Sequence, residues 1–427
     1  MVLVSILLVF LSALVCMGAW GYHIVKGGRV IGLTLHTVFF VFFLSVPAIV
    51  QLSYHSFPWI GERYPDLASV LAGSIIVLVY GMSFSAGYSF KRGRHRYGPE
   101  KIWRINHALV AIMLSVSFLP ALIMIKTVGA QNFFDGREAV GGVVYDSDSE
   151  LAMLYAASKF GVFSALLISL LINFVLRPYG WKAVLHRVLL SALILVNVII
   201  NGPQSSPRFH FLGMTIAILM SVGWLRGRRS NVLLFILSPL FLYFIFPWSK
   251  TIGSGSYALG GDVFEYIKSH VDFDSFLMIA NGYSYVSDSG VSLGLNFLGG
   301  MAFFVPRFLW ADKPLHLGAL SSDYVGYQYN NLSAPLPIEI YYSGSWIFLA
   351  VGAFLFGRLV SSADRVYAGG LARSGVGRYG VSIILISFLF ILLRGAFGAV
   401  APVISLAFFV FMVMSFFGFK EARVQSR

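Results

Sequence analysis

The amino-acid sequence predicts an all-α protein that crosses a membrane several times. Three observations support this class: 58% of the 427 residues are hydrophobic, only 11% are charged, and the hydrophobic residues form near-continuous runs. Soluble domains carry about 25% charged residues. Lipid cannot satisfy backbone polar groups, so a spanning segment must be a helix or part of a closed barrel. Runs of about 20 apolar residues without alternation favour helices.

We expect about 11 transmembrane helices, within a range of about 10 to 12. The first run lacks a basic leader and a convincing small-residue cleavage site, which indicates a retained helix rather than a signal peptide. The runs expected to cross the membrane are 2–22, 31–52, 67–89, 107–126, 151–176, 188–201, 209–225, 231–248, 337–357, 380–394 and 397–417.

Short basic loops predict the orientation of these helices. Five segments have an excess of Lys and Arg, and the positive-inside rule places them in the cytoplasm. They are 91–106, 177–187, 226–229, 358–378 and 420–427. The acidic loop 127–150 is expected on the outer side. Because 226–229 and 358–378 are both cytoplasmic, an even number of crossings separates them. The run 291–309 should therefore lie in, or dip into, the outer interface without crossing.

This topology divides the chain into three consecutive regions. Residues 1–248 are expected to form an N-terminal transmembrane bundle, and 249–336 a large outer loop with interfacial helices. Residues 337–427 supply the C-terminal transmembrane helices and a cytoplasmic tail. Within the outer loop, apolar residues interspersed with charged ones predict one amphipathic helix over 262–278.

Charge, cysteine content and motifs argue against several other functions. The net charge is +13, but the basic residues fall in short loops between spans, so they indicate membrane orientation and no nucleic-acid partner. Cys16 is the single cysteine, so we expect neither a disulfide framework nor a metal cluster. No Walker loop or dinucleotide fingerprint follows a strand, so ATP is not expected to power the protein.

Several cations are expected on the outer face without matching acids. Arg208 lies in a turn between two spans, and His210 follows two residues later. Arg307 and Lys313 form a second pair, and Arg394 interrupts an apolar run near its outer end. Guanidinium groups bind phosphate oxygens bidentately, so a lipid pyrophosphate is the expected ligand. The alternative is a set of unrelated interface anchors, with His210 an ordinary polar residue.

Acidic and aromatic residues complete the candidate site. Glu339 opens an apolar run, where desolvation of its carboxylate would suit it to accept a proton from a hydroxyl. The alternative for Glu339 is a salt bridge to an arginine. Asp272 and Asp274 are candidate contacts to a sugar or cation, or else solvated loop acids. Tyr341 could stack on a sugar ring or belong to an interfacial aromatic belt.

Three short segments carry a resemblance to a known family. They are 306–314 (PRFLWADKP), 339–341 (EIY) after a Ser/Pro-rich approach, and 206–208 (SPR) at the start of a span. Arg307 is also followed by Gly318 after ten residues. Together these features resemble the Wzy-type O-antigen polymerases, which join oligosaccharide repeat units. About 50 residues carry the close resemblance, and the rest of the topology matches loosely.

The resemblance implies a glycosyltransferase of the GT-C type in the bacterial inner membrane, with its active site facing the periplasm. It would transfer a growing polysaccharide from undecaprenyl pyrophosphate to the non-reducing end of a new lipid-linked repeat unit. Neither a cofactor nor a metal is expected. The expected partners are the lipid-linked donor and acceptor, the lipid bilayer and a chain-length regulator in the same membrane.

Roles can be assigned to the candidate residues on this hypothesis. Glu339 would deprotonate the acceptor hydroxyl, while Arg208, Arg307 and Arg394 would stabilise the leaving pyrophosphate. Lys313 would assist them, and Asp312 would orient a sugar or cation. Two alternatives stay open: an O-antigen ligase, which shares the topology and lipid donor, and a transporter or flippase of lipid-linked oligosaccharide. A transporter would favour paired charges deep in several spans.

Overall fold

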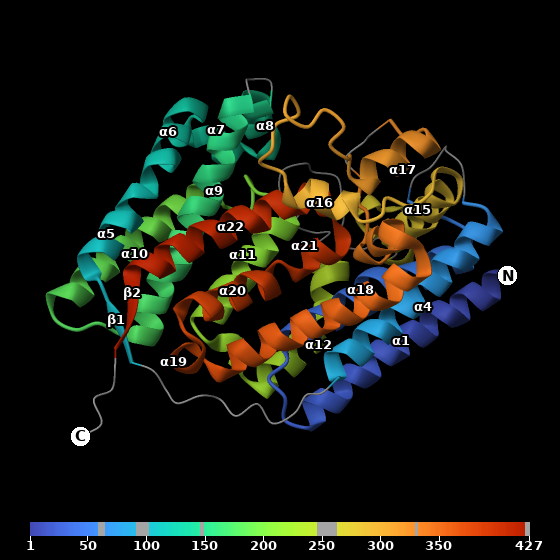
Figure 1. Cartoon of the computed structure of the whole chain (residues 1–427), viewed down its shortest axis with the longest axis horizontal. Coiled ribbons are helices and arrows are strands. Elements are labelled where there is room, and N and C mark those ends of the chain that lie inside the picture. The colour runs from blue at the N-terminus through green and yellow to red at the C-terminus, as the bar shows by residue number, and fades with distance from the viewer. Residues whose placement is uncertain (59–64, 91–101, 146–148, 246–262, 329–331, 423–427) are drawn as a thin grey trace. The chain divides into compact units, whose positions relative to one another are not determined.

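A computed structural model describes residues 1–58, 65–90, 102–145, 149–245, 263–328 and 332–422 (Figure 1). Within these ranges, eight helical segments are long and apolar enough to cross a membrane. The chain is therefore an all-α, multi-pass membrane protein. The eight segments are Val2–Val25, Ile31–Tyr54, Leu67–Ser89, His107–Val128, Met153–Leu176, Trp181–Ile200, Leu336–Gly369 and Phe397–Gly418.

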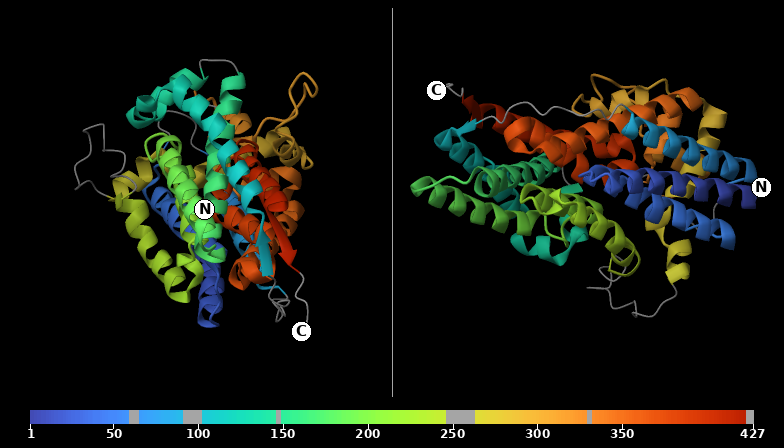
Figure 2. Two further views of the ribbon diagram at one scale, coloured as in Figure 1. Left: turned by 90° about the vertical axis from the view of Figure 1, so that its left-hand side faces the viewer. Right: turned by 90° about the horizontal axis from the view of Figure 1, so that it is seen from below.

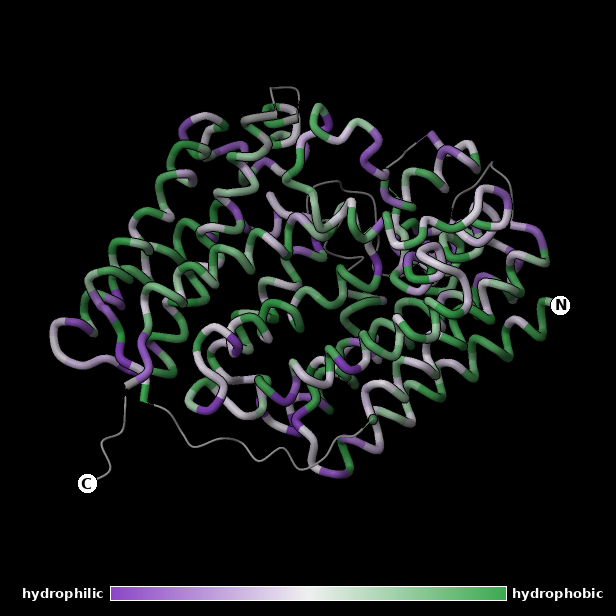
Figure 3. Tube along the Cα trace, viewed as in Figure 1, coloured by the Kyte–Doolittle hydropathy of each residue, from purple (hydrophilic) through white to green (hydrophobic). Residues whose placement is uncertain are grey.

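The three other expected spans are helical but shorter. They correspond to α11 (Arg208–Ser221), α12 (Arg228–Leu240) and α20 (Val376–Ser387). A π-helical segment, η4 (Phe241–Ile245), extends α12, and α21 (Leu389–Arg394) follows α20 after a break at Phe388. Hydrophobic residues cover the long helices, and hydrophilic residues gather near their ends (Figure 3). The full count of 11 spans stays a prediction.

The chain forms two compact units, each built from three separated segments. The first contains Met1–Gly93, Gly227–Ser362 and Leu389–Pro402, and the second contains Arg94–Arg226, Ala363–Phe388 and Val403–Arg427. The boundaries fall inside α18 (Leu336–Gly369) and α22 (Phe397–Gly418), so each of these helices contributes to both units. The three consecutive regions expected from the sequence are divided by the side of the membrane on which each segment lies. That division stays a prediction.

The first unit contains the spans at the N-terminus and the described part of the expected outer loop. Besides α12, η4, α21 and parts of α18 and α22, its elements are α1 (Val2–Val25), α2 (Ile31–Val38), η1 (Phe39–Ser45), α3 (Val46–Tyr54), α4 (Leu67–Ser89), α14 (Val263–Ser269), η5 (Val271–Phe273), α15 (Ser275–Ser289), α16 (Leu295–Met301) and α17 (Leu317–Val325).

Close helix packing in the first unit depends on small residues. Helices α1 and α4 run side by side (Figure 1, Figure 2). On the α4–α18 pair, a Cβ at Gly87 would clash with the carbonyl oxygen of Phe354, and one at Gly357 would clash with that of Phe84. Helices in lipid associate through such close backbone approaches, because lipid provides little hydrophobic driving force between them.

The second unit is a bundle around α9. Besides α11, α20 and parts of α18 and α22, its elements are β1 (Ile102–Ile105), α5 (His107–Val116), α6 (Phe118–Val128), α7 (Ala130–Asp135), α8 (Arg137–Tyr145), α9 (Ser149–Leu170), η2 (Leu171–Leu176), α10 (Trp181–Ile200), η3 (Trp224–Arg226), α19 (Leu371–Ser374) and β2 (Phe419–Ala422). Helix α9 packs against α6 and α10. Strands β1 and β2 pair antiparallel, with Ile105 opposite Phe419.

The expected outer loop differs from the sequence prediction in one respect. The prediction of a single amphipathic helix over 262–278 is wrong, because the chain there forms three separate elements, α14, η5 and α15. The side chain of His270 accepts a hydrogen bond from the Asp272 amide and so begins η5 as a new turn. The run 291–309 contains only α16, whose seven residues span about 10 Å and are too short to cross a bilayer.

Candidate functional site

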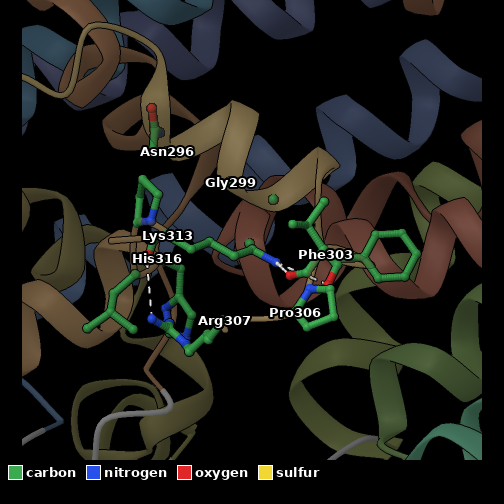
Figure 4. A pocket seen from close by; sticks show the side chains of 12 residues that line it. Asn296, Gly299, Phe303, Pro306, Arg307, Lys313 and His316 are labelled. Atoms are coloured by element: carbon green, nitrogen blue, oxygen red, sulfur yellow. Dashed lines mark hydrogen bonds between the residues drawn. The ribbon is translucent and has the colours of Figure 1, made fainter. Parts of the chain in front are cut away.

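A cavity of about 390 Å³ lies in the first unit, within the size range of small-molecule sites (Figure 4). Its walls come from α16, from the loop that joins α16 to α17, and from the start of α22. None of its lining residues is acidic, whereas Arg307, Lys313 and His316 are all basic. This imbalance makes the cavity a candidate site for an anion.

Arg307 is the cation with the most capacity to bind a ligand. Its side chain is exposed, and one Nη1–H donates to the carbonyl oxygen of Lys313 at 3.3 Å. The other guanidinium donors make no hydrogen bond to the residues that the structure describes. A guanidinium carries five donors in a planar fork that matches phosphate oxygens. Arg307 therefore retains the geometry needed for bidentate anion binding.

Lys313 has a different environment from its neighbour. Its Nζ donates to the carbonyl oxygens of Ala302, Phe303 and Val305 at 2.8, 3.0 and 3.3 Å. Figure 4 shows the Lys313 side chain directed at the turn that contains Phe303. An ammonium has three donors, so these bonds use all of them. Desolvation, followed by the nearby charge of Arg307, lowers the pKa of Lys313. The lysine thus holds the turn that follows α16 and contributes charge, rather than hydrogen bonds, to the cavity.

His316 also lines the cavity, and no pattern in the sequence marks it as a site residue. Its Nδ1 accepts a hydrogen bond from the Ala319 amide at 3.1 Å, which caps the N-terminus of α17. Burial lowers the pKa of His316, so the ring is neutral near pH 7. Since Nδ1 is an acceptor, the ring proton lies on Nε2. His316 therefore contributes a neutral ring with one N–H donor, at Nε2, to the lining of the cavity.

Glu339 lies behind the cavity wall and is only 1% exposed. Its Oε2 accepts from Asn296 Nδ2 at 2.7 Å, and its Oε1 accepts from the Phe397 amide at 3.2 Å. Phe397 is the first residue of α22, where the helix dipole also favours a carboxylate. Because Asn296 lines the cavity, the carboxylate is one side chain away from it.

The hydrogen bonds around Glu339 connect three helices. Asn296 lies on α16, Glu339 on α18 and Phe397 on α22, while Ser292 and Ser343 donate to the Asn296 Oδ1 at 2.7 and 2.9 Å. Among the described residues, no arginine lies within salt-bridge distance of Glu339. The network therefore fixes the wall of the cavity without a cationic partner.

Arg394 was expected to lack a matching acid, and that expectation is wrong. Its Nη2 lies 3.3 Å from Asp274 Oδ1 and also donates to the carbonyl oxygen of Val271. Ser333 donates to the same Asp274 oxygen at 2.9 Å. Burial raises the pKa of Asp274, although Arg394 and Ser333 act in the opposite direction. Arg394 is thus half-buried and forms an ion pair with a buried carboxylate.

The other candidates of the first unit lie outside the cavity lining. Asp312 is exposed on the loop between Arg307 and Lys313. The carboxylate Oδ2 of Asp272 lies 3.3 Å from His270 Nδ1. Tyr341 is buried, and its ring centroid lies 5.0 Å from that of Trp346 in an edge-to-face contact. These placements define the neighbours of the three residues and leave their predicted sugar contacts as predictions.

Arg208 and His210 belong to the second unit, where Arg208 is the first residue of α11. The His210 ring lies edge-to-face with Phe160, with 6.4 Å between centroids. Their predicted convergence with Arg307 stays a prediction. The same unit contains a residue that the sequence analysis missed, Lys159, which is 4% exposed and donates to Ser206 Oγ at 3.0 Å.

Lys159 has only neutral hydrogen-bond partners among the described residues. Its Nζ donates to the Tyr155 hydroxyl at 3.3 Å as well as to Ser206, and the ammonium lies 5.0 Å from the centroid of the Tyr155 ring. Asn201 donates to the Lys159 carbonyl oxygen at 3.0 Å. Lys159 therefore joins α9 to the turn that precedes Arg208.

Comparison of the chain with protein-family models, with curated proteins and with solved structures finds no match. In the part of the chain that the structure describes, no three His, Cys, Asp or Glu side chains form a group that could hold a metal ion. The cavity and its basic residues therefore provide the basis for a functional interpretation.

Proposed function

We propose that this protein is a membrane glycosyltransferase of the O-antigen polymerase type. It would transfer a growing polysaccharide from undecaprenyl pyrophosphate to the non-reducing end of a lipid-linked repeat unit. The observation that supports this most is the cavity with Arg307 and His316 as donors and no acid among its lining residues, in a multi-pass membrane protein. The resemblance of 306–314 to Wzy-type polymerases adds the substrate class.

The proposed reaction is a displacement at the anomeric carbon of the donor sugar. A hydroxyl oxygen of the acceptor bonds to that carbon, and the bond from the carbon to the pyrophosphate oxygen breaks. Arg307 and the His316 Nε2–H would stabilise the negative charge that develops on the leaving pyrophosphate. Lys313 would keep Arg307 in place, because Arg307 donates to its carbonyl oxygen.

Glu339 is the proposed acceptor of the hydroxyl proton. Its Oε2 is bonded to Asn296, which lines the cavity, so an acceptor hydroxyl that replaces the Asn296 amide would meet the carboxylate. Arg208 and His210 of the second unit are proposed to contact the substrate. Arg394 is paired with the Asp274 carboxylate, so it would have to release this carboxylate before it could bind a phosphate.

The finer assignments of fold and location belong to the same proposal. We propose a GT-C-type architecture with about 11 spans. We also propose a bacterial inner-membrane location with the cavity facing the periplasm. The expected partners are the two lipid-linked oligosaccharides and a chain-length regulator.

Deletion of the gene tests the proposal against its alternatives. Loss of a polymerase leaves one repeat unit on lipid A, loss of a ligase leaves none, and loss of a flippase accumulates substrate on the cytoplasmic leaflet. We expect a single repeat unit on lipid A, and long polymer to return on complementation with the wild-type chain. Long polymer in the deletion strain, or either of the other two patterns, would contradict the proposal.

A further inference from the structure

Beside the cavity, a continuous stretch of the first unit exposes large apolar side chains. Phe304 is 72% exposed and Phe308 is 83% exposed, and most of the neighbouring apolar residues are also accessible. We call this surface the 295–309 apolar face. Its members are Leu295, Leu298, Met301, Phe304, Phe308 and Leu309. Exposed apolar patches of this kind mark contacts with a partner or a membrane.

Helix α16 has two distinct sides. Asn296, Gly299 and Gly300 are buried and line the cavity. Leu295, Leu298 and Met301 follow at intervals of three and are exposed, so they occupy a different side of the helix. The helix therefore separates the anion cavity from an apolar surface that the described residues do not cover.

The bilayer is the occupant that fits this face. Helix α18 breaks at Gly344 and Ser345, whose backbone is not helical. Before the break, Glu339 accepts a hydrogen bond from Asn296 of α16; after it, Ile347, Val351 and Leu355 are exposed along one side of a candidate span. Those residues meet lipid if the span crosses the membrane, and the 295–309 apolar face belongs to the same unit. Arg307 lies between Phe304 and Phe308 in sequence, which suits a guanidinium at the level of lipid phosphates.

We infer that the 295–309 apolar face is immersed in the bilayer and carries the prenyl chain of a substrate whose pyrophosphate occupies the cavity. This inference rests on the proposed function and specifies how the substrate arrives. The lipid enters the site from within the membrane, with its tail on Phe304, Phe308 and Leu309 and its phosphates at Arg307. A water-soluble sugar phosphate would lack the tail contacts.

The immersion is tested with a fluorescent probe on the full chain. Phe308→Cys is labelled with an environment-sensitive dye and reconstituted in phosphatidylethanolamine–phosphatidylglycerol vesicles. The unmodified chain is the labelling control, since its single cysteine, Cys16, is buried. Asp323→Cys, at an exposed polar position of α17, is the matched control. We expect spin-labelled phospholipids to quench the dye at position 308 and aqueous iodide to quench it at 323. Equal quenching by iodide at both positions would overturn the inference.

The prenyl contact is tested by equilibrium binding, which requires no turnover. A triple variant should bind a long-chain polyprenyl pyrophosphate at least about tenfold more weakly, because it loses apolar contact area. It combines Phe304→Ser, Phe308→Ser and Leu309→Ser. Its affinity for farnesyl pyrophosphate, whose short tail reaches little of the face, should be unchanged. The matched control replaces three exposed leucines of α1 by serine, namely Leu3, Leu7 and Leu11.

Failure of the proposed tail contact and failure of the proposed polymerase function give different results. Equal loss for both pyrophosphates, or no loss for either, would overturn the proposed tail contact whatever the enzyme does. If the protein binds the long-chain lipid through these residues but the deletion strain still makes long polymer, the tail contact stands and the polymerase function fails.

Discussion

Arg307 in the first unit and Lys159 in the second show two different environments for a cation in this protein. Arg307 is exposed beside a cavity, and most of its donors have no described partner. Lys159 is 4% exposed and donates to the hydroxyls of Tyr155 and Ser206. A charge with available donors beside a cavity can bind a ligand, whereas a buried charge with bonded hydroxyls mainly organises the backbone around it.

A second difference concerns how each region is fixed. The wall of the cavity depends on a carboxylate, Glu339, that accepts amide hydrogen bonds from Asn296 and Phe397. The turn before Arg208 depends on an ammonium that donates to hydroxyls. We therefore expect substitutions in the first unit to affect ligand binding and activity, and those at Lys159 to affect stability alone.

The largest effect is expected for Arg307→Ala. Loss of a donor that stabilises charge in the transition state should lower the rate of polymerisation by about 10²- to 10³-fold. The amount and length of polymer formed over time in membranes measure this rate. Arg378→Ala, at an exposed arginine near the start of α20, is the matched control and should leave the polymer unchanged. Long polymer with Arg307→Ala would remove this residue from the chemistry.

Glu339→Ala should destabilise the first unit by about 1–3 kcal/mol, because the Phe397 amide loses its acceptor and the Asn296 amide keeps only the backbone carbonyl oxygen of residue 339. Glu339→Gln keeps one oxygen and should lose less. Thermal unfolding in detergent measures both, with Asp312→Ala as the exposed-carboxylate control. If Glu339 is the base, Glu339→Gln abolishes polymerisation in a folded protein. Full activity in that variant would leave Glu339 with a positioning role only.

Lys159→Met tests the other side of the comparison. Removal of a buried ammonium that has no described acidic partner should raise the free energy of unfolding by about 1 kcal/mol or leave it unchanged. Polymer length should stay that of the wild type. A folded Lys159→Met protein that makes no polymer would contradict this prediction, because Lys159 itself would then act in the reaction as well as in the fold.

The smallest effect concerns pH. The pKa of Asp274 is raised by burial, so the folded protein binds this proton more tightly than the unfolded chain does. Stability should therefore fall as pH rises from the ordinary aspartate pKa of about 4 to the raised value. Asp274→Asn should lose this slope in thermal unfolding over that window, whereas Asp312→Asn should retain it. An unchanged slope in Asp274→Asn would show that another group causes it.

Some of this architecture could be predicted from sequence because its signals are local. Apolar runs identify the long helices, and an ionisable residue such as Arg307 or Glu339 stands out in an apolar chain. The short lengths of α11 and α20 were not predicted, since hydropathy does not locate helix ends. The break at His270 depends on a side-chain cap that hydrophobic periodicity does not detect.

The parts of the site that could not be predicted depend on contacts between distant residues. Asn296 bonds to Glu339, 43 positions away, and the Phe397 amide bonds to Glu339, 58 positions away. His316 is an ordinary residue in the sequence until its Nδ1 is seen to cap α17. Lys159 was missed because its partner Ser206 is 47 positions distant.

Binding of a long-chain polyprenyl pyrophosphate to the full-length protein in lipid nanodiscs measures whether the cavity is the pyrophosphate site. We expect the wild type and Lys159→Met to bind it equally, and Arg307→Ala to bind it at least about tenfold more weakly, because charge-assisted phosphate hydrogen bonds are lost. Equal affinity of Arg307→Ala and the wild type, or a comparable loss in Lys159→Met, would contradict the assignment of the cavity as the pyrophosphate site.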